Sequence, residues 1–249
     1  MATIASVVRT GTLVPYDDSA RSKAVARTVS ASGVLPDWEE AWRQIYTPLL
    51  LQQGPERTRL VSVSSALDGE GKTTVAMGLA VTIADDLDTS VLLIDCNLLR
   101  PTLSEEVGLG DAHGVADWLG LDCASPGKIS LDTFSQPTSV KNLWVIPAGR
   151  RVANPSKLLR SASMADFLQQ IRARYDFVIM DTPSILSSSD TRLLTYCSDA
   201  LLFVVRTGVS TTGSVSKALG MVQGVSNRGI VMNDFQTAIP RTLQRFFVC

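Results

Sequence analysis

The feature that most restricts the fold of this chain is an alternation of short apolar runs with longer stretches of helical periodicity. Four of the runs are almost continuously apolar, a pattern typical of parallel strands covered on both faces. We interpret six runs as strands, at residues 60–65, 91–95, 143–147, 176–181, 200–206 and 229–233. Because helical patterns separate most of these runs, the sequence predicts an α/β fold: a doubly wound, mostly parallel sheet with helices on both faces.

The helical patterns also indicate where the ordered part of the chain begins. They lie at residues 36–53, 154–175 and 211–225. The first pattern has Asp37 as a candidate N-cap and carries an amphipathic stripe made of Trp38, Ala41, Trp42, Ile45 and Leu49. The preceding residues are rich in Ser, Ala, Thr and Arg and show no periodicity. We therefore expect a flexible leader over 1–35 and one domain over 36–249.

The composition argues against several classes of protein. A net charge of −1 gives no overall field for nucleic acid, so we expect no nucleic-acid partner. The single histidine, His113, is interpreted as a loop or cap residue. Four scattered cysteines favour free thiols over disulfides or a zinc site; they are Cys96, Cys123, Cys197 and Cys249. With no apolar run long enough to span a membrane and no signal-peptide pattern, we expect a soluble, cytoplasmic protein.

A glycine-rich stretch, "ALDGEGKTT" at residues 66–74, follows the first predicted strand and opens a helical pattern. Gly71-Lys72-Thr73 matches the end of the Walker A motif, although Ala66 replaces its first glycine. Such a loop binds phosphates because backbone N–H groups converge there at a helix N-terminus. The predicted nucleotide-binding residues of this loop are Gly69, Glu70, Gly71, Lys72, Thr73 and Thr74. The alternative is an ordinary strand–turn–helix junction.

Two acids at strand ends complete the predicted site. Asp181 ends the fourth predicted strand, at the Walker B position, and Asp95 ends the second. Ligands of doubly wound sheets bind outside the carboxyl ends of the strands, so both acids and the loop should share one crevice. We predict that Lys72 contacts the β- and γ-phosphates of ATP and that Thr73, Asp181 and Asp95 hold Mg²⁺. Lys72, Asp95 and Asp181 are the predicted catalytic residues. Lone acids at strand ends are alternatively caps or turn formers.

These residues, together with several other stretches, resemble the bacterial tyrosine kinases of the capsular and exopolysaccharide family, which are P-loop ATPases. The resemblance runs from about Trp38 to Asp234. Its stretches are "EAWR", "SALDGEGKTT", "VLLIDCNLLRPTL", "VIPAGRRVANPSKLL", "YDFVIMDTPSIL", "SDALLFVVRTG" and "GIVMND". The combination of "PAG", "NP" and "LL" upstream of "YDFVIMDTP" is more specific to this family than the phosphate loop is.

The resemblance implies transfer of the γ-phosphate of ATP to tyrosines in the protein's own C-terminal tail, presented to the next subunit of a ring. It also implies activation by the cytoplasmic segment of a membrane polysaccharide co-polymerase, at the inner face of the cell membrane. The helix that carries Glu40 and Arg43 would form the homo-oligomer. Asn233 falls where relatives contact the nucleotide base; the alternative is a strand-end turn residue.

Departures from the family pattern keep other hypotheses open. Asn97 replaces the second acid of the family's Asp-x-Asp, and Leu99 replaces a basic residue ahead of Arg100. Tyr46 replaces the second arginine of the oligomerisation helix, and no tyrosine follows Tyr196. One alternative function is therefore a catalytically degenerate, nucleotide-dependent regulator of the same machinery. Another is a partition- or division-type ATPase, a group that usually has an additional lysine early in the phosphate loop.

Two further hypotheses concern residues near the ends of the sequence: a candidate phosphate acceptor and a candidate membrane contact. Tyr16 lies beside two aspartates and is a candidate acceptor for another subunit; the alternative is a solvated tyrosine. Near the C-terminus, Leu243, Phe246 and Phe247 lie close to one face of a helical pattern that also contains arginines. This pattern is typical of peripheral membrane contact, and the alternative is a terminal helix whose aromatic residues pack on the core.

Overall fold

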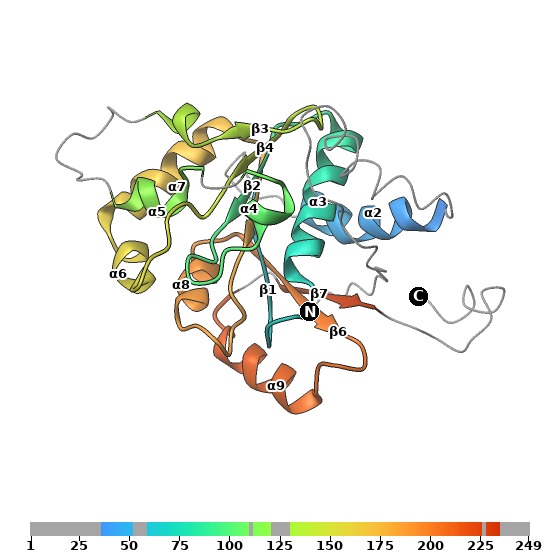
Figure 1. Ribbon diagram of the computed structural model, residues 1–249. Helices are drawn as coiled ribbons and strands as arrows, with labels where there is room; N and C mark the ends of the chain where they lie inside the picture. The colour runs from blue at the N-terminus through green and yellow to red at the C-terminus, as the bar shows by residue number, and fades with distance from the viewer. Residues whose placement is uncertain (1–35, 52–58, 110–111, 121–129, 226–227, 235–249) are drawn as a thin grey trace.

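The computed structural model describes residues 36–51, 59–109, 112–120, 130–225 and 228–234 (Figure 1). The elements, in chain order, are α2 (Pro36–Leu51), β1 (Arg59–Ser65), α3 (Lys72–Leu87), β2 (Val91–Asp95), α4 (Leu103–Glu106), α5 (Val115–Leu119), η1 (Leu131–Thr133), β3 (Gln136–Pro137), β4 (Leu143–Ile146), α6 (Pro155–Leu159), α7 (Ala162–Arg174), β5 (Phe177–Asp181), α8 (Asp190–Tyr196), β6 (Ala200–Arg206), α9 (Thr212–Met221) and β7 (Arg228–Asn233). The predicted leader over 1–35 and the predicted C-terminal helix lie outside the described residues, as do Cys123 and Cys249.

The strands form one sheet in the order β3-β4-β2-β5-β1-β6-β7. All neighbouring pairs are parallel except β3 and β4. The apolar runs become strands because helices cover both faces of the sheet, so β2 and β5 are buried along their whole length. The prediction of a doubly wound, mostly parallel sheet is confirmed.

All six predicted strands are confirmed, and their bounds differ from the predictions by no more than one residue. Strand β3 was not predicted, because its two residues at the edge of the sheet are too few to form an apolar run. The helix predicted over 154–175 is two helices, α6 and α7, which are separated at Arg160 and Ser161. The N-cap predicted at Asp37 is wrong, because α2 begins at Pro36.

Alternate residues of β1, β2, β4, β5 and β6 belong to two hydrophobic layers, one on each face of the sheet. On one face, Val61 and Val63 of β1 pack with residues of α2 and α3. On the other face, Leu60 of β1 packs with residues of α5, α7 and α8, while α9 covers Leu201 and Phe203 of β6. Figure 1 shows α2 and α3 on one side of the sheet and α5, α6 and α7 on the other. The two layers hold the strands in register.

Helix α2 packs along α3 through its apolar stripe. Trp42 and Ile45 are fully buried. The indole of Trp42 fills the space beside Gly78 of α3, where an added Cβ would lie 2.3 Å from a ring carbon. The absence of a side chain at Gly78 is therefore what lets the two helices approach closely.

A polar cluster joins the same two helices near the end of α3. Asp86 accepts hydrogen bonds from the Nε of Arg43 at 2.9 Å and from the hydroxyl of Tyr46 at 2.7 Å. Burial, reinforced by the hydrogen bond to Asp86, raises the pKa of Tyr46 to about 12. The hydrogen bond from Arg43 holds the pKa of Asp86 below its usual value. Tyr46, which departs from the family pattern, therefore anchors α2 to its own domain.

Other expectations about single residues concern the loops. His113 lies in the loop before α5 and is exposed, with its Nδ1 3.7 Å from Asp117, so its interpretation as a loop residue is confirmed. Cys96 and Cys197 are free thiols, as expected for cysteines without paired spacing. Within the described ranges no helix has both the length and the apolar character needed to cross a membrane.

Candidate phosphate-binding site

The loop over residues 66–71 joins the carboxyl end of β1 to the first turn of α3. Gly69 has a φ of +81° and Gly71 a φ of +91°, a region of backbone conformation that favours glycine. Gly71 has a second constraint, because a Cβ there would lie 2.0 Å from Nδ2 of Asn233 at the end of β7. Because α3 begins directly after Gly71, the unpaired N–H groups of its first turn lie at this loop, as anion binding requires.

Side chains at the ends of two other strands hold the backbone of this loop. Arg206 of β6 donates to the carbonyl oxygen of Gly69 at 3.1 Å. Asn233 of β7 donates from Nδ2 to the carbonyl oxygen of Glu70 at 3.0 Å. The Oδ1 atom of Asn233 is buried and has no hydrogen-bond partner in the described structure. Asn233 therefore lies at the predicted site and keeps one acceptor available.

Glu70 has a different place from the other predicted nucleotide-binding side chains. It is fully buried, and its carboxylate accepts hydrogen bonds from the backbone N–H of Leu67 at 2.8 Å and from the hydroxyl of Ser210. The side chain thus braces the loop against the segment between β6 and α9. Because its side chain is used within the protein, only the backbone N–H of Glu70 is available to a phosphate.

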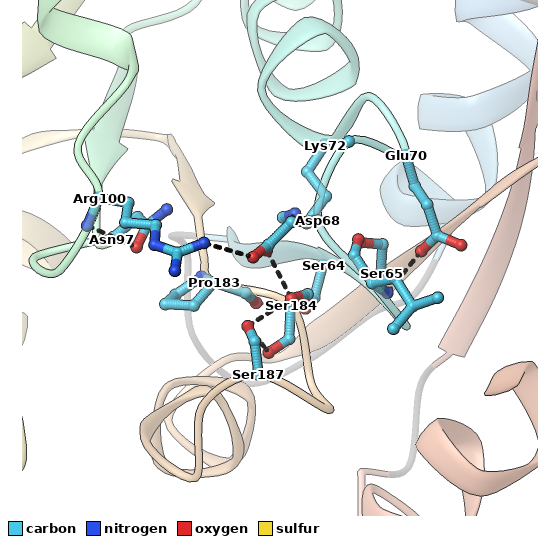
Figure 2. A network of polar contacts seen from close by, with 12 residues as sticks. Ser64, Ser65, Asp68, Glu70, Lys72, Asn97, Arg100, Pro183, Ser184 and Ser187 are labelled. Carbon is cyan, nitrogen blue, oxygen red and sulfur yellow. Dashed lines mark hydrogen bonds and ion pairs between the residues drawn. The ribbon is translucent and has the colours of Figure 1, made fainter. Parts of the chain in front are cut away.

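The first turn of α3 carries the remaining predicted residues of the loop. Lys72 is buried, and its Nζ lies 3.7 Å from Oδ1 of Asp68 (Figure 2). The hydroxyl of Thr73 donates to Oδ2 of Asp181 at 2.6 Å. Thr74 follows on the same turn and is half-buried. An ammonium group, a hydroxyl and a carboxylate are therefore in place around one helix N-terminus.

Asp181 is buried, and only one of its two carboxylate oxygens has a hydrogen-bond partner among the described residues. The oxygen without a described partner is Oδ1. Burial raises the pKa of Asp181 to about 7, and the nearby carboxylate of Asp95 adds to the rise. A buried anionic oxygen without a donor is costly unless a ligand satisfies it. The arrangement of Thr73 and Asp181 fits a magnesium ion, which is commonly held by one or two carboxylates together with phosphate oxygens.

Asp95 is the register partner of Asp181 on the neighbouring strand β2. Unlike Asp181, it uses both oxygens within the protein: Oδ1 accepts from the N–H of Asn97 at 2.9 Å, and Oδ2 accepts from Thr102 and Leu103 at 3.2 and 3.1 Å. Burial raises the pKa of Asp95 to about 6 although these three hydrogen bonds oppose the rise. In the structure Asp95 shapes the loop after β2.

The structure thus brings together all the residues that the sequence analysis placed at this site. It adds others that the sequence analysis did not single out as site residues, namely Asp68, Ser184, Arg206, Ser210 and Glu106. Their contacts join segments far apart in the chain, so no local sequence pattern predicted them. Among the described residues no cluster of three or more histidine, cysteine or acidic side chains is arranged to hold a metal ion. A magnesium ion here would depend on Thr73, Asp181 and phosphate oxygens.

Comparison with known proteins decides the family. A family model described as an AAA domain matches residues 58–235. The tyrosine-protein kinase YwqD of Bacillus subtilis is 31% identical over 196 residues, which cover 78% of this chain and 80% of YwqD. The chain belongs to the bacterial tyrosine-kinase family. The tyrosine-protein kinase Wzc of Salmonella typhimurium is 29% identical over 196 residues, and the match covers 78% of this chain but only 26% of Wzc. The chain thus spans about a quarter of that longer relative.

Solved structures of the bacterial tyrosine-kinase family agree with this assignment. The kinase domain of the Escherichia coli tyrosine kinase Etk superposes with a TM-score of 0.74 at 28% identity, covering 86% of this chain and 82% of that one. The cell-division ATPase MinD of Pyrococcus furiosus gives a TM-score of 0.57 at 23% identity, covering 76% and 78%. The likeness to MinD extends to the P-loop ATPase fold alone.

Proposed function

We propose that this chain binds Mg²⁺-ATP at the loop over residues 66–71 and transfers the γ-phosphate to tyrosine, regulating exopolysaccharide biosynthesis and export. We further propose that it acts on the cytoplasmic side of the cell membrane with the cytoplasmic segment of a membrane polysaccharide co-polymerase. The observation that carries the proposal is the pairing of Thr73 with Asp181 beside Lys72, with one buried carboxylate oxygen of Asp181 that has no partner among the described residues. Membership of the bacterial tyrosine-kinase family supports the reaction type.

Each residue has a chemical task in this proposal. The backbone N–H groups of the loop and the ammonium of Lys72 bind and orient the β- and γ-phosphates. Thr73 and Asp181 hold Mg²⁺, which neutralises charge that develops on the phosphates during transfer. Asp95 fixes the loop that follows β2 and lies beside Asp181. Asn233 contributes to the nucleotide its Oδ1 acceptor, which has no hydrogen-bond partner within the part of the chain that the structure describes.

Burial reduces the number of tyrosines that are candidate phosphate acceptors. Tyr46 and Tyr175 are buried, whereas Tyr196 on α8 is 56% exposed. Tyr16 lies outside the described residues. We propose Tyr196 and Tyr16 as the two candidate acceptors, each presented to another copy of the chain. Assembly through the helix that carries Glu40 and Arg43 remains part of this proposal.

The direct test is incubation of the purified chain with γ-labelled ATP and Mg²⁺. Label on tyrosine that is absent from Lys72→Met identifies a kinase, and its loss in Tyr16→Phe or Tyr196→Phe identifies the acceptor. Release of free phosphate without labelled protein would instead identify an ATPase switch. A protein that yields neither product refutes phosphotransfer by the chain alone. The same assay with the partner's cytoplasmic segment tests activation.

A second candidate is a nucleotide-dependent regulator without phosphotransfer. It is favoured by Asp95, whose two oxygens already accept three backbone hydrogen bonds, and by Asn97, whose amide cannot take a proton. If the lack of a second acid at position 97, where the family has Asp-x-Asp, limits the reaction, Asn97→Asp should raise turnover. An unchanged rate in Asn97→Asp would show that the acid is not limiting.

A further inference from the structure

Asp68 joins three segments of the site through one carboxylate (Figure 2). Its Oδ1 lies 3.7 Å from Nζ of Lys72 and accepts a hydrogen bond from the hydroxyl of Ser184 at 2.6 Å. Its Oδ2 accepts from Nη1 of Arg100 at 3.3 Å. Asp68 itself lies in the phosphate loop, Arg100 in the loop after β2 and Ser184 in the loop after β5. A single acid therefore bridges the phosphate loop and both strand-end loops.

The two cations that Asp68 joins can be reached by one small anion. Lys72 is the lysine of the phosphate-loop motif, and the carboxylate of Asp68 touches it and Arg100 at the same time. Guanidinium and ammonium groups both donate charge-assisted hydrogen bonds to carboxylate and phosphate oxygens, the guanidinium often through two N–H groups and the ammonium as a compact point charge. The carboxylate of Asp68 therefore occupies a position between two cations that also suits a phosphoryl group.

The contacts of Asp68 can be broken at low cost. The side chain of Asp68 is 47% exposed and that of Arg100 is 80% exposed, so water can replace the ion pair between them. Lys72, in contrast, is 9% exposed in its side chain and needs an anionic partner. A bound triphosphate would supply that partner, and its negative charge would repel the carboxylate of Asp68.

We propose that Asp68 competes with the terminal phosphates of the nucleotide for Lys72 and Arg100, and that Arg100, once released, binds the γ-phosphate. This inference rests on the proposed nucleotide site. Asp68 then sets the affinity of the site for any nucleotide, because the β-phosphate, one of the two that Lys72 contacts in the proposed site, is present in both ADP and ATP. Arg100 sets the preference for ATP over ADP.

Calorimetric titration of the full chain with Mg²⁺-ATP and Mg²⁺-ADP tests the role of Asp68. Asp68→Asn removes the charge but keeps an oxygen that can accept from Ser184, so folding is preserved. We expect roughly tenfold tighter binding of ADP, the change that about 1.4 kcal/mol produces, and at least the same gain for ATP, because Arg100 is released to its γ-phosphate. The gain should shrink as ionic strength rises, because salt screens the exposed part of the interaction. Asp85→Asn, the same exchange at an exposed position of α3, is the matched control and should bind as the native chain does.

Arg100→Gln in the Asp68→Asn background tests the second half of the proposal. With its competitor already removed, loss of Arg100 should weaken ATP binding by about tenfold and leave ADP binding nearly unchanged. Equal weakening for both nucleotides, or none, would overturn the assignment of Arg100 to the γ-phosphate.

The outcomes separate this inference from the proposed function. If the native chain binds ATP and Asp68→Asn binds it equally or more weakly, competition by Asp68 is refuted and the nucleotide site stands. If only Asp68→Asn binds ATP, competition is supported and the native chain is not active as proposed. If neither protein binds any nucleotide, both ideas fail together.

Discussion

At the carboxyl-terminal part of α3, Asp86 accepts hydrogen bonds from both Arg43 and Tyr46. Beside the other end of the same helix, Asp181 of β5 has a buried oxygen that no donor reaches in the described ranges. Both clusters join α3 to a neighbouring element through a carboxylate. In the cluster around Asp86 the polar groups bind one another, as stable packing demands. In the cluster around Asp181 one carboxylate oxygen is left for a ligand. The difference separates the part of α3 that stabilises the fold from the part that we expect to bind nucleotide.

The largest effect should come from Lys72→Met at the binding end. Loss of the buried ammonium removes the charge that faces the phosphates, so we expect Mg²⁺-ATP affinity to fall by about a hundredfold or more. The free energy of unfolding should not fall, because a buried cation is replaced by an apolar side chain of similar length. Calorimetry and chemical denaturation measure the two quantities. Lys217→Met, an exposed lysine of α9, should change neither.

Asp181→Asn should separate metal binding from folding. The amide still accepts from Thr73 but no longer offers an anionic oxygen to Mg²⁺. We expect ATP affinity in the presence of Mg²⁺ to fall by roughly tenfold to a hundredfold, and affinity measured in EDTA to stay nearly constant. Equal losses with and without the metal would mean that Asp181 does not hold it.

Gly78→Ala should disturb the stabilising part of α3 and leave the site intact. A new Cβ would meet the ring of Trp42, so we expect the free energy of unfolding to fall by about 1–3 kcal/mol even though alanine favours helix. Gly220→Ala on α9 has open space around it and is the matched control, with unchanged or slightly higher stability. A stable Gly78→Ala would show that α2 does not need this close contact.

Tyr46→Phe should have the smallest effect, about 1 kcal/mol of stability at neutral pH, with no change in ATP affinity. Its pH dependence identifies the cause. The folded-state pKa of Tyr46 is raised to about 12, above the ordinary value of 10.0, so the contribution is complete below pH 10 and is lost as pH rises toward 12. Denaturation across this range should show the native chain converging on Tyr46→Phe.

The fold was largely predictable because its signals are local. Short runs such as 91–95 are apolar throughout, and only a strand covered on both faces needs that composition. The break between α6 and α7 was missed because the apolar periodicity continues across Arg160 and Ser161. The edge strand β3 forms by pairing with β4, and its two residues are too few to show a strand pattern in the sequence.

The candidate site was predictable only where a motif fixes the spacing. Lys72, Thr73 and Asp181 follow from the phosphate loop and from an acid at a strand end, and the structure brings them together. The bridge from Asp68 to Ser184 and Arg100 joins positions 116 and 32 residues apart, so no local pattern indicates it. The inward orientation of Glu70 was also hidden, because its partner Ser210 lies 140 residues away.

The contact between Gly71 and Asn233 affects when the phosphate loop can become complete during synthesis of the chain. The phosphate loop lies near the beginning of the domain, yet part of its support comes from β7, the last strand described. A ribosome therefore delivers the loop long before the residue that backs it. A nascent chain that has not reached position 233 would carry the whole Walker A sequence without the support of Asn233. We therefore expect tight nucleotide binding only by chains that already contain β7.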